Sequence, residues 1–329
     1  MTTPQWPGFD DEIRAWMIEA PGAPPGSSPE VIRGYSRRNS ALSFARARPS
    51  LTAASVVDQT VDGPDGPIPV RIFTPPAGAE PTPVVVYFHG GGWVIGDLDT
   101  HLAQAHRLCV EVGAVVVSVG YRLAPEHRFP AAFDDCLAVT EWAAANATAL
   151  GGDPQLLVVA GDSAGGQLAA SVAIACRDDG LPLAGQLLLY PVATVAGYYG
   201  DDDANAAFAS RVQCGDGPGL LVTTMVWFAQ TYADSAHAED WRLSPMAATL
   251  TGLAPAVVHL AHFDMLRDEG NQYAEALREA GVPVIARKFP SLHHGYFGLG
   301  GVSAAADAAA TLAAADLRDI LGLPARPAV

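Results

Sequence analysis

The chain has 329 residues, half of them hydrophobic, which suits one large globular domain with a substantial core. Its formal net charge of −16 argues against nucleic acid or a membrane as the partner, because phosphates and anionic lipids both require basic patches. The cysteines are widely spaced and form no CxxC pair, so neither a disulfide framework nor a metal site is predicted.

The chain starts without the basic residues and apolar run of a secretory signal, and no stretch is long and uncharged enough to span a bilayer. We therefore expect a cytoplasmic protein. The first fifty residues carry amphipathic helical pieces on either side of a Pro/Gly/Ser stretch, Pro21–Pro29. Either these pieces pack over the core as the first part of a cap, or they form a disordered tail.

After this region, short β-branched runs at Ser55–Thr60 and Val70–Thr74 predict antiparallel strands, because Asp-Gly turn signals separate them. From about Pro83 onward, apolar runs alternate with alanine-rich helical segments. The expected strands are Val84–Phe88, Val115–Val119, Leu156–Ala160, Gln186–Tyr190, Ala256–Ala261 and Val284–Phe289. The expected helices are His101–Val112, Ala131–Ala147, Ala164–Arg177, Asp268–Ala280 and Ala304–Ile320.

This alternation predicts an α/β fold with a mostly parallel central sheet flanked by helices, because continuous apolar runs are typical of strands buried on both faces. One acidic, glycine-rich segment with a helical stretch at Gly219–Tyr232 interrupts the alternation, and long excursions of this kind are often lids. We therefore divide the chain into residues 1–50 as the N-terminal part of a helical cap, 51–191 as the first part of the core, 192–245 as a cap insertion, and 246–329 as the second part of the core.

A candidate nucleophile lies in the sequence Gly161-Asp162-Ser163-Ala164-Gly165, between an expected strand and an expected helix. This is the context that the G-x-S-x-G motif requires. Glycine is needed on either side because the turn is too tight for side chains there, and the strained turn exposes the serine hydroxyl at the carboxyl ends of the strands. Ser163 is therefore the predicted nucleophile.

A candidate oxyanion hole follows the strand Val84–Phe88, which ends in His89-Gly90-Gly91-Gly92-Trp93. Ordering three adjacent glycines costs more backbone conformational entropy than ordering other residues, so we infer that this loop requires a backbone without side chains. Acyl transfer supplies that need, because N–H groups must reach the tetrahedral oxyanion. The N–H groups of Gly91, Gly92 and Ala164 are the expected donors, and His89 is expected to hold the loop by hydrogen bonds.

The acid and the base are expected to follow Ser163 in that order. The strand Ala256–Ala261 runs out into His262-Phe263-Asp264. Asp264 is a better acid than Asp268 or Glu269, which a helix N-terminus already explains. The base is expected in the loop that follows Pro290. The residues alone do not separate His293 from His294 there.

Taken together, the motifs resemble the hormone-sensitive-lipase-like family of microbial esterases in the α/β-hydrolase superfamily, from about residue 56 onward. The matching segments are HGGGWVIGD at His89–Asp97, YRLAPEHRFPAA at Tyr121–Ala132, GDSAGG around Ser163 and DMLRDEG from Asp264. The family's catalytic histidine directly precedes Gly-Phe, which His294-Gly295 matches with Tyr296 in place of the phenylalanine, so the resemblance implies His294 as the base. It also implies Asp264 as the acid and Gly91, Gly92 and Ala164 as the oxyanion donors.

The resemblance implies a serine carboxylesterase that hydrolyses short- to medium-chain acyl esters without a cofactor, and it suggests a homodimer. Apolar side chains that could line the acyl pocket are Trp93, Met225, Phe228, Leu266 and Phe297. Three alternatives remain open: an amidase or deacylase with the same triad, a non-catalytic small-molecule receptor, and a lipase activated at an interface.

Overall fold

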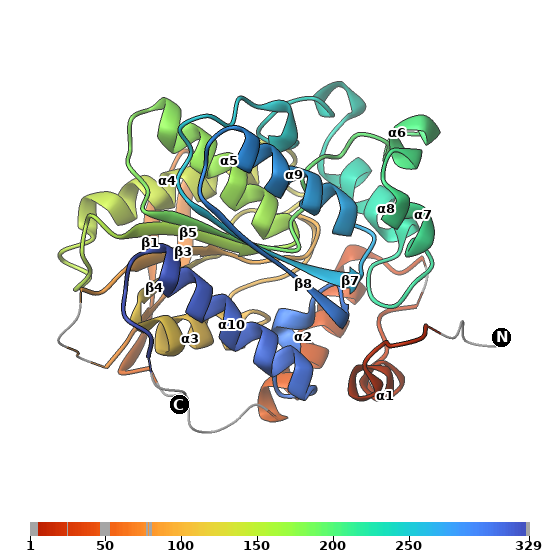
Figure 1. Cartoon of the computed structure of the whole chain (residues 1–329), viewed down its shortest axis with the longest axis horizontal. Coiled ribbons are helices and arrows are strands. Elements are labelled where there is room, and N and C mark those ends of the chain that lie inside the picture. Colours follow the sequence, from red (N-terminus) through yellow and green to blue (C-terminus); the bar gives the residue numbers. More distant parts are fainter. Residues whose placement is uncertain (1–5, 25, 47–52, 77, 79–80, 327–329) are drawn as a thin grey trace.

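The computed structural model describes residues 6–24, 26–46, 53–76, 78 and 81–326. Within these ranges, eight strands form one sheet in the order β1-β2-β4-β3-β5-β6-β7-β8, with helices on both faces (Figure 1). Pairing is antiparallel for β1–β2 and β2–β4 and parallel from β4 to β8, which confirms the predicted mostly parallel sheet. The strands are β1 (Ser55–Gly63), β2 (Gly66–Thr74), β3 (Val84–Phe88), β4 (Val115–Val119), β5 (Leu157–Asp162), β6 (Gly185–Leu189), β7 (Ala256–Phe263) and β8 (Val284–His293).

The helices that cover the sheet agree closely with the predicted segments. They are α3 (Leu102–Arg107), α4 (Ala131–Asn146), α5 (Ala164–Asp178), α9 (Arg267–Glu279) and α10 (Ala304–Ile320). The segment predicted as one helix over 101–112 differs, because α3 passes into a π-helical turn, Leu108–Gly113, before β4. Gly113 ends that turn with a φ of +74°, a conformation that suits glycine.

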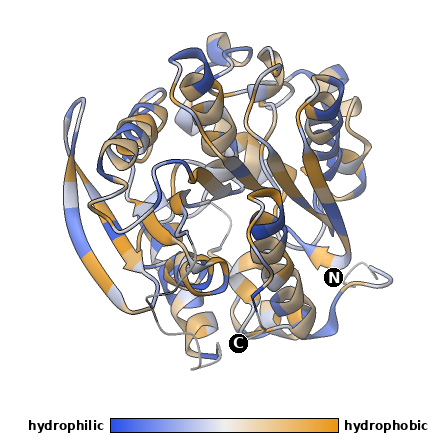
Figure 2. Ribbon diagram, turned by 60° about the vertical axis from the view of Figure 1, so that its left-hand side comes forward, coloured by the Kyte–Doolittle hydropathy of each residue, from blue (hydrophilic) through white to orange (hydrophobic). Residues whose placement is uncertain are grey.

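The apolar strands are buried because both faces of the sheet are covered. Alternate residues of β3 enter two different hydrophobic clusters: Val84, Val86 and Phe88 face one, and Val85 and Tyr87 face the other. Figure 2 shows the hydrophobic colour concentrated on the central strands.

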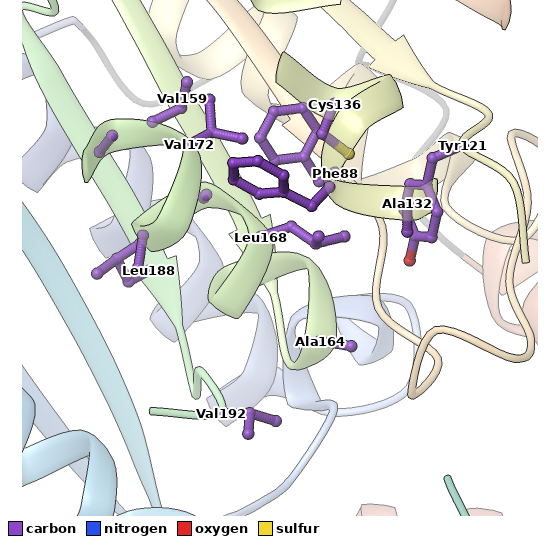
Figure 3. Close-up of a cluster of buried hydrophobic side chains, with 14 of the residues drawn as sticks. Phe88, Tyr121, Ala132, Cys136, Val159, Ala164, Leu168, Val172, Leu188 and Val192 are labelled. Carbon is purple, nitrogen blue, oxygen red and sulfur yellow. The ribbon is translucent and has the colours of Figure 1, made fainter. Parts of the chain in front are cut away.

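In the first of these clusters, Phe88 lies among Cys136, Val159, Leu168 and Val172, from α4, β5 and α5 (Figure 3). This packing fixes the start of α5 against the end of β3. The two motifs that begin there, the glycine loop and the G-x-S-x-G turn, are therefore held on one rigid core.

Strand β8 is longer than expected, and this corrects one sequence prediction. The strand was expected to end before Pro290, with both candidate histidines in a loop, but it continues to His293. Proline is tolerated because β8 is an outermost strand with one unpaired edge. An irregularity in the pairing of β7 at Ala261–Phe263 accommodates the extension.

Five further helices lie beyond the carboxyl ends of β7 and β8 (Figure 1). They are α1 (Asp11–Glu19), α2 (Pro29–Arg46), α6 (Asp202–Ala206), α7 (Ala209–Gln213) and α8 (Val222–Tyr232). The first two come from the N-terminal region and the others from the segment between β6 and β7, and we call these five the cap helices. No helix in the described ranges is long and apolar enough to cross a membrane.

Side chains fasten both groups of cap helices to the core. Arg33 on α2 donates to the carbonyl oxygen of Val94 at 2.8 Å and forms an ion pair with Glu126. Arg211 on α7 forms a buried ion pair with Glu269 on α9, with 2.5 Å between the nitrogen and the oxygen. The helices from both cap segments are therefore attached next to the predicted site.

Candidate active site

The Ser163 side chain lies at the sharp turn between β5 and α5. Its φ of +57° and ψ of −121° are strained for a non-glycine residue, and such strain costs about 1–3 kcal/mol. Side chains at the flanking glycines are excluded: a Cβ at Gly161 would overlap the carbonyl of Gly165, and one at Gly165 would overlap the carbonyl of Phe88. The local sequence therefore forces the serine out of the core.

His294 bridges Ser163 and Asp264 through its two ring nitrogens. Nε2 lies 2.8 Å from Ser163 Oγ, and Nδ1 lies 2.8 Å from Asp264 Oδ2. Asp264 is buried, and its other oxygen accepts a hydrogen bond from the backbone N–H of Leu266 at 2.9 Å. A carboxylate accepts the Nδ1 proton, so this arrangement leaves the Nε2 lone pair facing the serine hydroxyl.

His293 points away from the serine. It is buried against the ring of Phe9, at a centroid separation of 5.6 Å. Burial lowers the pKa of His293 to about 4, which keeps the ring neutral near pH 7. The structure therefore brings His294, and not His293, to Ser163.

The three expected oxyanion donors are the backbone N–H groups of Gly91 and Gly92, which line the cavity at Ser163, and of Ala164, the residue that follows the serine. Gly91 and Gly92 have φ values of +121° and +58°, and Ala164 is the first residue of α5. Among the described residues, none accepts a hydrogen bond from these three N–H groups. The positive end of the α5 dipole lies at the same point, so the position favours a developing negative charge.

The glycine loop is braced from behind by buried polar groups. His89 Nδ1 donates to the carbonyl of Gly90 at 2.8 Å, and the hydroxyl of Tyr121 donates to the carbonyl of His89 at 2.7 Å. Burial lowers the pKa of His89 to about 4, so the ring is neutral and acts as a structural hydrogen-bond donor rather than a base.

Asp162 is a brace that the sequence reasoning did not single out. Its Oδ1 accepts hydrogen bonds from the N–H of Gly90 at 2.9 Å and from the hydroxyl of Tyr87 at 2.6 Å. Burial opposes ionisation of this carboxyl, but the nearby His101 and the Tyr87 hydroxyl outweigh it and lower its pKa. The sequence could have indicated this role, because an aspartate at the end of a buried strand, next to the nucleophile, requires hydrogen-bond partners.

A cavity of about 430 Å³ opens above Ser163 and His294. This volume is within the range of about 300–1,000 Å³ that is usual for small-molecule pockets. Of the five side chains proposed to line it, Met225 and Phe228 on α8 do so. Trp16 on α1 and Phe44 on α2 also line it, and they were missed because contacts between the N-terminal helices and the core leave no local pattern.

The other three pocket residues were predicted wrongly. Trp93 is fully buried, donates to Gln167 at 2.9 Å and stacks on Tyr232, so its ring belongs to the core. Leu266 is also fully buried, and Phe297 packs in the cluster on the opposite face of the sheet. None of the three lines the cavity. Core packing and substrate binding both require apolar side chains, and the sequence does not distinguish between these two roles.

Among the described residues, no group of three or more His, Cys, Asp or Glu side chains is arranged to hold a metal ion. The side chains of Ser163, His294 and Asp264 form one hydrogen-bonded chain.

Comparison with known proteins identifies the family of this chain. A family model described as the alpha/beta hydrolase fold matches residues 85–298. The chain belongs to the α/β-hydrolase family. Esterase LipI of Mycobacterium tuberculosis is 42% identical over 272 residues, which cover 81% of this chain and 82% of LipI. Carboxylesterase NlhH of the same organism is 41% identical over 270 residues, covering 78% of this chain and 82% of NlhH.

A similar solved structure is an esterase from Pyrobaculum calidifontis. It is 35% identical, has a TM-score of 0.86, and the match covers 95% of this chain and 99% of the archaeal one. These relatives confirm the resemblance to the hormone-sensitive-lipase-like esterases, and they confirm the predicted α/β-hydrolase fold.

Proposed function

We propose that this α/β-hydrolase is a serine carboxylesterase in which Ser163, His294 and Asp264 form the catalytic triad. The observation that carries the proposal is the hydrogen-bonded chain from Ser163 Oγ through His294 to Asp264, with 2.8 Å at each step. Relatives above 40% identity that are named esterase and carboxylesterase support the reaction class.

The mechanism follows from the positions of these groups. His294 Nε2 takes the proton of Ser163 as Oγ attacks the ester carbonyl, and Asp264 stabilises the imidazolium that forms. The N–H groups of Gly91, Gly92 and Ala164 bind the oxyanion, and each such donor is typically worth about a hundred- to a thousandfold in rate. His294 then protonates the leaving alcohol. In the second half, His294 activates water, which releases the acid from the acyl-enzyme.

We further propose short- to medium-chain acyl esters as substrates, which fits a cavity of about 430 Å³. The test is the initial rate on p-nitrophenyl esters from acetate to palmitate, measured with the wild type and with Ser163→Ala. A serine-dependent optimum at short or medium chains is expected. An optimum at palmitate, or equal rates in the folded Ser163→Ala variant, would contradict the proposal.

The triad serves amide hydrolysis equally well in principle, so the ester assignment needs its own test. Matched ester and amide substrates with the same acyl group should differ in kcat/KM in favour of the ester. A higher kcat/KM on the amide would make the chain an amidase or deacylase. The homodimer stays a proposal as well, and light scattering that gives a monomer mass would remove it.

A further inference from the structure

The side chain of Gln104 lines the cavity but takes no part in the proposed reaction. It lies on α3 and is 7% exposed. Among the described residues, none forms a hydrogen bond with its side-chain amide, and the amide atoms are not fully enclosed by protein, so they reach the cavity. A buried amide that faces an open cavity without a protein partner is available to a ligand.

Gln104 lies where three elements of the pocket wall meet. A Cβ placed on Gly298, in the turn after His294, would be 2.8 Å from Gln104 Nε2. The hydroxyl of Ser43 on α2 donates to the carbonyl of the same Gly298 at 2.8 Å. The amide is therefore close to both α2 and the histidine loop.

Polar groups connect this point to the nucleophile. His101, the N-cap residue of α3, lies three residues before Gln104 and also lines the cavity. Its Nε2 is 3.6 Å from Oδ1 of Asp162, the residue before Ser163. This face of α3 is thus a polar wall of the cavity that begins beside the nucleophile.

Helix α2 continues the polar surface above Gln104. Ser36, Ser40 and Ser43 line the cavity at intervals of four and three residues, which places them on one face of the helix. On α8, by contrast, Met225 and Phe228 line the cavity. The pocket therefore has one apolar wall and one polar wall.

The charge of the lining restricts what the polar wall can bind. Among the described residues, the lining includes Asp99 and Asp162 but no lysine or arginine. The pKa of Asp162 is below its ordinary value despite its burial, so this carboxylate stays ionised near pH 7. Asp99 is paired with Arg71, with 2.8 Å between the nitrogen and the oxygen, so the charge that opposes a carboxylate on the substrate is that of Asp162. A neutral hydrogen-bonding group meets no such repulsion.

We propose that Gln104, with Ser36 and Ser40, forms a polar subsite for a neutral hydroxyl, ether or carbonyl group that the ester carries beside its reacting carbonyl. The inference rests on the proposed esterase function. That group can belong to the alcohol part or to the acyl part of the ester, and the two cases require different substrates.

The test is the ratio of kcat/KM between a polar ester and its apolar counterpart. For the alcohol part, 2,3-dihydroxypropyl butyrate is compared with propyl butyrate, and for the acyl part, ethyl 4-oxopentanoate is compared with ethyl pentanoate. Each ratio is measured for the wild type, Gln104→Leu and Gln104→Asn. Gln272→Leu, at an exposed glutamine on α9, is the matched control. A change that affects both esters alike cancels in the ratio.

One of the two wild-type ratios is expected to favour the polar ester, and Gln104→Leu should lower it by about two- to tenfold, which is the usual contribution of one uncharged hydrogen bond. Gln104→Asn should lower it less, and Gln272→Leu should not change it. The subsite proposal is overturned if the wild type hydrolyses the plain esters but prefers neither polar ester, or if Gln104→Leu leaves the ratios unchanged. No hydrolysis of any ester would instead overturn the proposed function itself.

Discussion

Gly92 is the position at which the cap and the oxyanion loop can be tested together. Its φ is +58°, and a Cβ built there would lie within 3.0 Å of three ring atoms of Phe228, on α8 of the cap. In Gly92→Ala, the left-handed backbone alone costs about 1–2 kcal/mol. The overlap adds to this, so either the glycine loop or the cap helix must move.

Movement of the loop would carry the Gly92 N–H away from the oxyanion. Because one oxyanion donor is typically worth about a hundred- to a thousandfold in kcat, we expect Gly92→Ala to lower kcat on p-nitrophenyl butyrate at least about a hundredfold. Removing the obstructing ring should relieve part of the loss. The double variant Gly92→Ala/Phe228→Ala is expected to recover at least about tenfold, measured relative to Phe228→Ala alone.

Gly91 provides the matched control. A Cβ at Gly91 would overlap the backbone carbonyl of Ile95, which no side-chain substitution removes. Phe228→Ala should therefore leave the activity of Gly91→Ala unrelieved. Full activity of Gly92→Ala would refute the role of this loop in the reaction. Failure of Phe228→Ala to rescue a folded Gly92→Ala, as judged by circular dichroism, would refute the contact on which the reasoning depends.

Three further predictions concern the acid, the cap attachment and the buried histidine. Asp264→Asn should keep the fold but lower kcat by about 10⁴-fold, because the amide selects the wrong His294 tautomer. A loss of kcat below tenfold in steady-state kinetics would contradict the triad. Arg211→Leu leaves Glu269 buried without its cation, so it should lower the free energy of unfolding by about 3–5 kcal/mol. Urea titration measures this change, and a loss below about 1 kcal/mol would contradict a buried ion pair. The folded pKa of His293, about 4, lies below the unfolded value of about 6.5, so its contribution to stability is present above pH 6.5 and lost as the pH falls toward 4. Between pH 7.5 and 5 the titration of His293 should therefore lower the free energy of unfolding by about 2 kcal/mol. The His293→Gln variant should lack this loss, and a variant whose free energy of unfolding falls with pH as steeply as that of the wild type would contradict the assignment.

Much of the site could be predicted because its signals are local. The G-x-S-x-G turn follows from the steric limits at Gly161 and Gly165, and these involve only neighbouring backbone. The strand β3 could also be predicted from a local signal, because a continuous apolar run is typical of a strand buried on both faces.

The features that were predicted wrongly depend on contacts between distant segments. Strand β8 passes through Pro290 only because it is outermost in the sheet, and an isolated sequence does not show strand order. That extension decides between the histidines: His293 is the last residue of the strand and packs on Phe9, whereas His294 follows it and turns to Ser163. Trp93 was wrongly predicted to line the pocket because the sequence does not show that its ring stacks on Tyr232, which is distant in the chain.

The most direct test of the central claim is covalent trapping of the nucleophile. The protein is treated with diethyl p-nitrophenyl phosphate, which phosphorylates activated serines, and the modified residue is located by peptide mass spectrometry. We predict one diethylphosphoryl group, on Ser163, formed in step with the loss of esterase activity, and no modification of the Ser163→Ala variant. Modification of a different residue, or complete loss of activity with Ser163 unmodified, would contradict the assignment of Ser163 as the nucleophile.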